Sequence, residues 1–200
     1  KFNEEIDFLG ANINFYESGA SANGLSRYSA RILELLADGA LNPLFTQADF
    51  DAERAKLIEG LKSDEKSASA IAARVQNVLT FGKEHYNGEF TSEETLKNVT
   101  LQDVINHYNT YFVPANAYLV IIGDVKTKDV KKKVEQLFGA DVWKTATAPN
   151  LTYNDPKDLQ YSQINFVDVP NAVQSEIALI NLSKLKMNDK DYFAAILANQ

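Results

Sequence analysis

Metal chemistry is the first possibility raised by the reactive side chains of this sequence, and it needs histidine or cysteine grouped with carboxylates. The chain has two histidines and no cysteine. His85 lies in the turn-rich segment FGKEHYNGEF, where its neighbour Glu84 is not at a helical ligand spacing, and His107 lies in the helical pattern DVINHYNTYF. Neither H-x-x-E-H, H-E-x-x-H nor any other pair of histidines four residues apart occurs. We interpret both histidines as ordinary structural or surface side chains.

Nucleophilic and phosphate-binding chemistry have no local support in the sequence either. It has no G-x-S-x-G, G-x-G-x-x-G or G-x-x-x-x-G-K-[ST] segment, and the lack of cysteine excludes thiolate nucleophiles and disulfides. The formal net charge of −7 argues against a general nucleic-acid binder, because phosphate contacts need clustered lysine and arginine. The one basic cluster, Lys131, Lys132 and Lys133, lies in a helical pattern and is interpreted as a solvated helix face.

Carboxylates gather in the segment FDAERAKLIEGLKSDEK at residues 50–66, which has the composition of an exposed charged helix. Its carboxylates include Glu53, Glu59, Asp64 and Glu65. At about 100° per residue Glu53 and Glu59 lie about 120° apart around the helix axis, so they do not share a face. Paired-carboxylate chemistry is therefore not predicted here.

Apolar spacing and capping residues predict the elements that would position these side chains. Helical patterns cover residues 2–9, 26–41, the segment that follows Thr46, 69–81 with Gly82 beyond the end, the segment that follows Thr100, 128–138 closed by Gly139, and the segment that follows Asn188. Strand patterns cover residues 11–18, 117–125, 163–169 and 175–182, and the apolar run at 117–125 indicates burial. The strict strand-helix-strand rhythm of a doubly wound sheet is missing. We therefore predict an α+β fold with helices packed on a mainly antiparallel sheet.

The order of several segments resembles the insulinase/pitrilysin family of zinc metallopeptidases, which includes mitochondrial processing peptidase. The similar segments are residues 7–11, 33–45, 50–61, 81–88, 101–125, 134–139 and 167–179. The chain is most similar to the bacterial zinc proteases of the family. The resemblance implies a processing-peptidase-like domain whose C-terminal part is residues 1–139. A linker at 140–160, where helical and strand periodicity is lost, would then lead to the beginning of a second homologous domain at 161–200. On this view both chain ends are cuts through a longer protein.

The resemblance also implies where zinc ligands should stand. In the family an H-x-x-E-H helix supplies two ligands and the general base, and a glutamate six residues after a Glu-Arg pair completes the site. The H-x-x-E-H position would fall before residue 1. The pair is present as Glu53 and Arg54, but the sixth residue after it is Gly60, and Glu59 is one position short, rotated by about 100°. We therefore expect no catalytic residue and no metal ligand in this chain, with Glu53, Arg54 and Gly60 as remnants of the family motif.

These features predict a non-catalytic domain of the inactive type, which would line a peptide-binding chamber or pair with a catalytic half and be inactive alone. Its expected partners are peptide or unfolded polypeptide and a catalytic domain or subunit of the same family. Zinc is expected only in a parent protein or partner that carries an upstream H-x-x-E-H. No nucleic acid is expected, and no membrane span, since no apolar run approaches about 20 residues.

Two alternatives stay open at this point. The chain would be a fragment of an active zinc endopeptidase if H-x-x-E-H lies upstream of residue 1, with Glu59 as the third zinc ligand. It would otherwise be an unrelated α+β interaction domain. The resemblance to bacterial members also suggests a periplasmic or otherwise exported protein.

Overall fold

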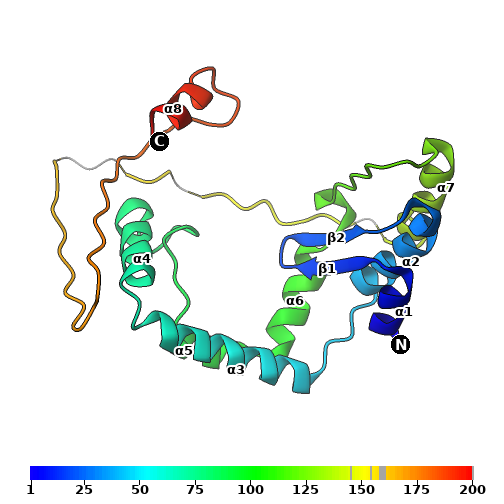
Figure 1. Ribbon diagram of the computed structural model, residues 1–200, viewed down its shortest axis with the longest axis horizontal. Coiled ribbons are helices and arrows are strands. Elements are labelled where there is room, and N and C mark those ends of the chain that lie inside the picture. Colours follow the sequence, from blue (N-terminus) through cyan, green and yellow to red (C-terminus); the bar gives the residue numbers. More distant parts are fainter. Residues whose placement is uncertain (145, 154, 158–160, 200) are drawn as a thin grey trace. The chain divides into compact units, whose positions relative to one another are not determined.

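The computed structural model describes residues 1–144, 146–153, 155–157 and 161–199, and helices dominate it (Figure 1). One antiparallel sheet of two strands, β1 (Asn12–Tyr16) and β2 (Gly19–Asn23), accompanies them. The α-helices are α1 (Phe2–Leu9), α2 (Ser29–Leu41), α3 (Gln47–Asp64), α4 (Ala68–Phe81), α5 (Glu93–Asn98), α6 (Leu101–Tyr111), α7 (Thr127–Phe138) and α8 (Tyr192–Ala198). Two short 3-10 helices are η1 (Ser26–Tyr28) and η2 (Pro114–Asn116).

The chain forms two compact units. Unit 1 contains Lys1–Asp51 and Val99–Asn150, and unit 2 contains Ala52–Asn98 and Leu151–Gln200. The predicted division into residues 1–139, a linker at 140–160 and residues 161–200 stays a prediction. Residues 145, 154 and 158–160 of that linker lie outside the described residues, and its described part has no helix or strand.

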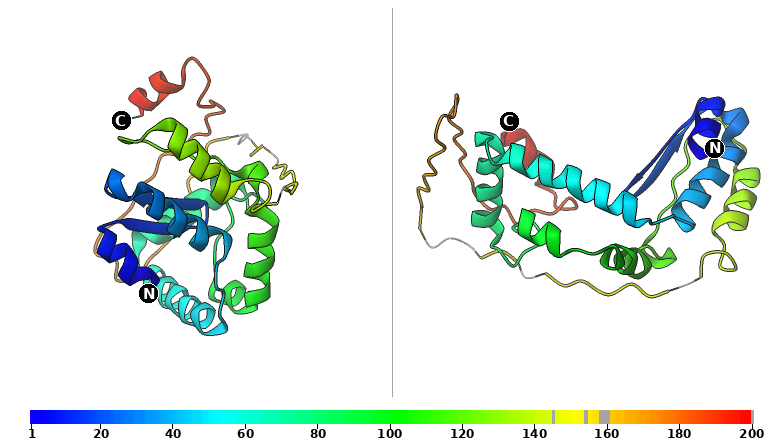
Figure 2. Two further views of the ribbon diagram at one scale, coloured as in Figure 1. Left: turned by 90° about the vertical axis from the view of Figure 1, so that its right-hand side faces the viewer. Right: turned by 90° about the horizontal axis from the view of Figure 1, so that it is seen from below.

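The apolar core of unit 1 lies where α1 and α2 meet the β1–β2 hairpin. Gly10 ends α1 in the left-handed conformation, at φ 59°, and this turns the chain into β1. A buried cluster fills the space between these elements: Ile6, Leu9, Ala11, Ile32 and Leu35. Figure 2 shows α7 beside α2, in agreement with the contacts between the two helices. Local apolar spacing predicts α1, α2, α7 and β1, whereas β2 was not predicted from the sequence.

Charged side chains join the helices of unit 1 around Glu34 on α2. Arg31 donates to Glu34 at 2.7 Å and to both carboxylate oxygens of Glu5 on α1, at 2.5 and 2.9 Å. Lys133 on α7 also donates to Glu34. Hydrogen bonds from Lys133 and then from Arg31 lower the pKa of the Glu34 carboxyl below its ordinary value of 4.5. The network therefore connects α1 to α2 through Glu5 and Arg31, and α2 to α7 through Glu34 and Lys133.

Acid should weaken unit 1 through Glu34. Because its pKa is lower in the folded chain, its stabilising contribution is present above pH 4.5, the ordinary value, and is lost as the pH falls through the folded-state pKa. We expect Glu34→Gln to lower the free energy of unfolding at neutral pH by about 0.5 kcal/mol, since the pair is partly exposed, and to flatten the pH dependence between about 5 and 3. Urea unfolding at several pH values measures both effects.

The fluorescence of the single tryptophan reports unit 1 in this experiment, because Trp143 stacks on Phe112 within that unit. Glu17→Gln is the matched control, since Glu17 is exposed and makes no ion pair with any described residue. If the free energy of unfolding of the Glu34 and Glu17 variants changed with pH in the same way, Glu34 would not be the group through which acid weakens unit 1.

Three of the four predicted strands are corrected by the structure. Residues 12–16 form β1 as expected, but residues 117–125, 163–169 and 175–182 form no strand, because no described segment forms the backbone hydrogen bonds of a ladder with them. The predicted burial of residues 117–125 is also wrong: the side chains of Tyr118 and Ile122 are 95% and 92% exposed. The mainly antiparallel sheet is thus reduced to one hairpin in a mostly helical chain.

The prediction of no membrane span concerns helix length and hydropathy. Within the described ranges, no helix combines the length and the apolar character needed to cross a bilayer.

Candidate functional site

Glu53, Arg54 and Gly60, the predicted motif remnants, lie on α3, and Thr46 caps the beginning of this helix. The Asp49 backbone N–H donates to Thr46 Oγ1 at 3.1 Å, and the Thr46 hydroxyl donates to the Asp49 carboxylate at 2.6 Å. Glu53 and Glu59 form exposed salt bridges along α3. Glu53 pairs with Lys56 at 2.5 Å, and Glu59 pairs with Lys62 at 3.1 Å.

Gly60 lies in the regular part of α3 and faces open space. A β-carbon added there would meet no atom within 4 Å. Glu59 beside it is 75% exposed. Since a larger side chain would fit at position 60, steric crowding does not explain the glycine in place of the glutamate that the resemblance implies.

The structure places both histidines in ring contacts. His107 packs against Tyr111 on α6, with ring centroids 4.6 Å apart, and His85 stacks on Phe81 at 5.1 Å. His85 Nδ1 accepts a hydrogen bond from the Asn87 backbone N–H at 3.1 Å, so this nitrogen is occupied. Among the described residues no three histidine, cysteine or acidic side chains gather as metal ligands. The donor set does not fit the tetrahedral site of the family.

The segment between α4 and α5, residues 82–91, forms a compact loop in unit 2. The His85 carbonyl accepts hydrogen bonds from the backbone N–H groups of Gly88 at 2.7 Å and Glu89 at 2.9 Å. Gly82 has a φ of 82°, a conformation that favours glycine. Gly88 is buried so close to Gly82 that an added β-carbon would overlap the Gly82 carbonyl oxygen. The backbone of the loop is therefore fixed by its own contacts.

An aromatic cluster supports the loop from one side. The His85 ring stacks on Phe81, with centroids 5.1 Å apart, and on Tyr86 at 4.5 Å. Tyr153 packs against Tyr86 at 4.5 Å and His85 at 5.9 Å. Although His85 is a ring in this cluster rather than a metal ligand, it holds Tyr86 in place.

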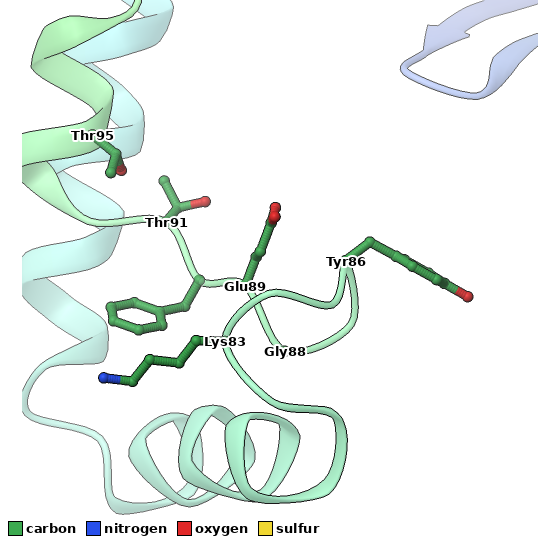
Figure 3. A pocket seen from close by; sticks show the side chains of 7 residues that line it. Lys83, Tyr86, Gly88, Glu89, Thr91 and Thr95 are labelled. Carbon is green, nitrogen blue, oxygen red and sulfur yellow. The ribbon is translucent and has the colours of Figure 1, made fainter. Parts of the chain in front are cut away.

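Two open hollows lie along the loop in unit 2. The larger has a volume of about 540 Å³ (Figure 3) and is lined by Lys83, Tyr86, Gly88, Glu89, Phe90, Thr91 and Thr95. The smaller, of about 240 Å³, is lined by Leu61, Asp64, Ala70, Arg74, Asn77, Glu89, Phe90 and Thr91. Residues 89–91 thus separate the hollows and line both. Sequence reasoning missed this site, and its one local signal was the pair of glycines that flank the aromatic residues of FGKEHYNGEF.

A second feature of unit 2 is a pair of extended segments joined by a turn, which we call the arms: residues 163–169 and 175–182. The Ala172 N–H donates to the Val169 carbonyl at 3.2 Å, and Asn171 has a φ of 64°. Proline before a residue of positive φ is typical of a type II turn. The arms expose large apolar side chains, and their most exposed members are Ile164 (99%), Phe166 (88%), Ile177 (87%) and Leu179 (100%). The arms are therefore an unpartnered apolar surface.

Comparison with solved structures shows which fold this arrangement belongs to. A protease from Helicobacter pylori matches with a TM-score of 0.67 and 17% identity, and covers 78% of this chain and 39% of its own. The peptidase M16 inactive domain from Pseudomonas fluorescens matches with a TM-score of 0.65 and 17% identity, over 78% of this chain and 40% of its own. The chain thus spans about two fifths of each of these proteins. No curated protein matches it.

A comparison with protein families assigns the sequence itself. Residues 98–200, more than half of the chain, match the family described as the peptidase M16 inactive domain. The matched range begins just before α6 and extends through both arms. The expected membership of an inactive-type metallopeptidase family is confirmed, and the chain belongs to the peptidase M16 inactive domain family.

Proposed function

We propose that this chain is a non-catalytic domain of a metallopeptidase-family protein, which holds extended polypeptide for a catalytic domain or subunit of the same family. The observation that carries the proposal is the match of residues 98–200 to the inactive-domain family. Gly60 supports it, since it stands where the resemblance requires a ligand glutamate.

The arms are the surface that we propose for polypeptide contact. Extended backbone with unpaired N–H and carbonyl groups can add a strand from a partner chain, and the flanking side chains then supply apolar contacts. Phe166 and Leu179 are 88% and 100% exposed and stand in different arms. An unfolded polypeptide offers both unpaired backbone and apolar side chains, so it is the partner that this surface fits.

The second candidate is that the chain is part of an active zinc endopeptidase. The matching protein from Helicobacter pylori is a protease, and this chain spans only 39% of it. On this reading Glu59 would be the carboxylate ligand, and both histidine ligands would come from residues outside this chain. The third alternative, an unrelated interaction domain, is wrong, since the chain belongs to the family.

Binding without cleavage tests the proposal. We expect the chain to bind a fluorescently labelled, reduced and carboxymethylated polypeptide, measured by anisotropy, and to leave it intact by mass spectrometry. Phe166→Ser and Leu179→Ser should each weaken binding about fivefold, because each removes an apolar side chain that the bound partner would cover.

Matched controls come from apolar residues of similar exposure outside the arms. Phe8 and Leu44 are 84% and 85% exposed and lie in unit 1. Phe8→Ser and Leu44→Ser should leave binding unchanged. Equal losses for control and arm variants would show non-specific adhesion, and cleavage of the polypeptide by the chain alone would refute the non-catalytic role.

A further inference from the structure

The larger hollow beside the 82–91 loop is lined by one cationic side chain, Lys83, and one acidic side chain, Glu89. Arg74, which lines the smaller hollow, lies over the Phe90 ring with its guanidinium carbon 5.4 Å from the ring centroid. Neither Lys83 nor Arg74 makes an ion pair with a described residue. Three other lysines of unit 2 are paired with glutamates: Lys56, Lys62 and Lys97. Lys83 is therefore available to an anionic ligand.

Glu89, the acidic residue that lines the larger hollow, points away from the Lys83 ammonium. Figure 3 shows the side chains of Lys83 and Glu89 extending in different directions, with the Glu89 carboxylate on the side of Thr91 and the Lys83 ammonium away from it. A ligand carboxylate at Lys83 would thus lie away from the Glu89 carboxylate, in a hollow that Phe90 also lines. The phenyl ring of Phe90 is 48% exposed and offers an apolar surface in the same hollow.

The wall is also preorganised, which lowers the entropy cost of binding. The His85 carbonyl holds the backbone of Gly88 and Glu89, and the cluster of His85 and Tyr153 fixes Tyr86. Tyr86 itself lines the hollow and is 55% exposed. The loop can therefore present an ammonium group and two aromatic rings without folding on its ligand.

We propose that this hollow binds a carboxylate of an extended peptide, next to an aromatic side chain of the same peptide. Lys83 pairs with the carboxylate, and Phe90 and Tyr86 contact the neighbouring ring. Glu89 disfavours a second acidic residue on its own side of the loop. This inference rests on the proposed function, because it names the peptide feature that a polypeptide-holding domain would select.

Labelled short peptides of alanine and serine, amidated at the C-terminus and containing one Phe-Asp or one Phe-Asn pair, test the proposal by anisotropy. We expect the Phe-Asp peptide to bind the wild-type chain about fivefold more tightly, the size of one partly exposed ion pair. Lys83→Gln should remove this preference, and added salt should reduce it. Glu89→Gln should preserve or increase it. A third peptide that ends in Phe with a free carboxylate shows whether a terminal carboxylate serves as well as an aspartate.

Lys66→Gln is the matched control, since Lys66 is an exposed lysine of unit 2 without an ion pair to any described residue. It should keep the full preference for Phe-Asp. A preference that survives Lys83→Gln, or one that Lys66→Gln removes equally, overturns the inference. If the wild type binds both peptides equally and only the arm variants weaken binding, the inference fails while the proposed function stands. If the wild type binds neither these peptides nor unfolded polypeptide, both fail.

Discussion

Leu35→Ala should lower the free energy of unfolding of unit 1 by about 3 kcal/mol, the middle of the range for a buried leucine. Leu35 is 4% exposed and lies in the cluster with Ile6, Leu9 and Ile32. Truncation removes apolar contacts and leaves a cavity that α1 and the hairpin can fill only by moving. Urea unfolding followed by Trp143 fluorescence measures the change, because Trp143 belongs to the same unit.

Leu44→Ala is the matched control for this substitution. Leu44 is 85% exposed in the same unit, so its truncation should change the free energy of unfolding by less than about 0.5 kcal/mol. A loss below about 1 kcal/mol for Leu35→Ala would mean that the cluster of α1, α2 and the hairpin is not the core of unit 1.

Gly88→Ala should open the 82–91 loop. It should lower the free energy of unfolding by about 1–3 kcal/mol, the usual effect of adding a group to a packed site. The added β-carbon would overlap the Gly82 carbonyl oxygen, which is backbone and cannot rotate away. The hydrogen bonds from Gly88 and Glu89 to the His85 carbonyl should weaken as the loop separates. Amide hydrogen exchange at residues 88 and 89 measures this, and it should accelerate because exchange reports local opening.

Gly60→Ala is the control for Gly88→Ala, since both add one methyl group in unit 2. Gly60 is helical and faces open space, so alanine should stabilise α3 by up to about 1 kcal/mol. We therefore expect Gly60→Ala to raise the free energy of unfolding and Gly88→Ala to lower it. Unchanged exchange at residues 88 and 89 in Gly88→Ala would show that the loop is not closed by the contact with Gly82.

The sequence could predict the helices because their signals are local. The cap of α6 shows this: Thr100 and Asp103 form the reciprocal hydrogen bonds that their spacing predicts, with the Asp103 N–H donating to Thr100 Oγ1 at 3.2 Å and the Thr100 N–H donating to the Asp103 carboxylate at 2.8 Å. The same reasoning places the end of α1 at Gly10 and the end of α4 before Gly82.

Strands and the hollow could not be predicted in the same way, because they depend on distant neighbours. The alternation at Ile164 and Phe166 is typical of a strand, but a ladder needs a second segment at hydrogen-bonding distance. The hollow depends on the approach of Gly88 to Gly82, which spacing alone does not reveal. By contrast, the position of Gly60 relative to Arg54 follows from the residue count alone, and its role as a motif remnant stays a prediction.

The zinc content of the purified chain tests the non-catalytic role most directly. The wild type and Glu59→Gln would be incubated with zinc, dialysed against metal-free buffer and assayed by plasma mass spectrometry. We expect far less than one zinc ion per chain for both proteins, because Glu59 is paired with Lys62 and no described histidines join it. One zinc ion per wild-type chain, lost in Glu59→Gln, would contradict the non-catalytic role and establish Glu59 as a ligand.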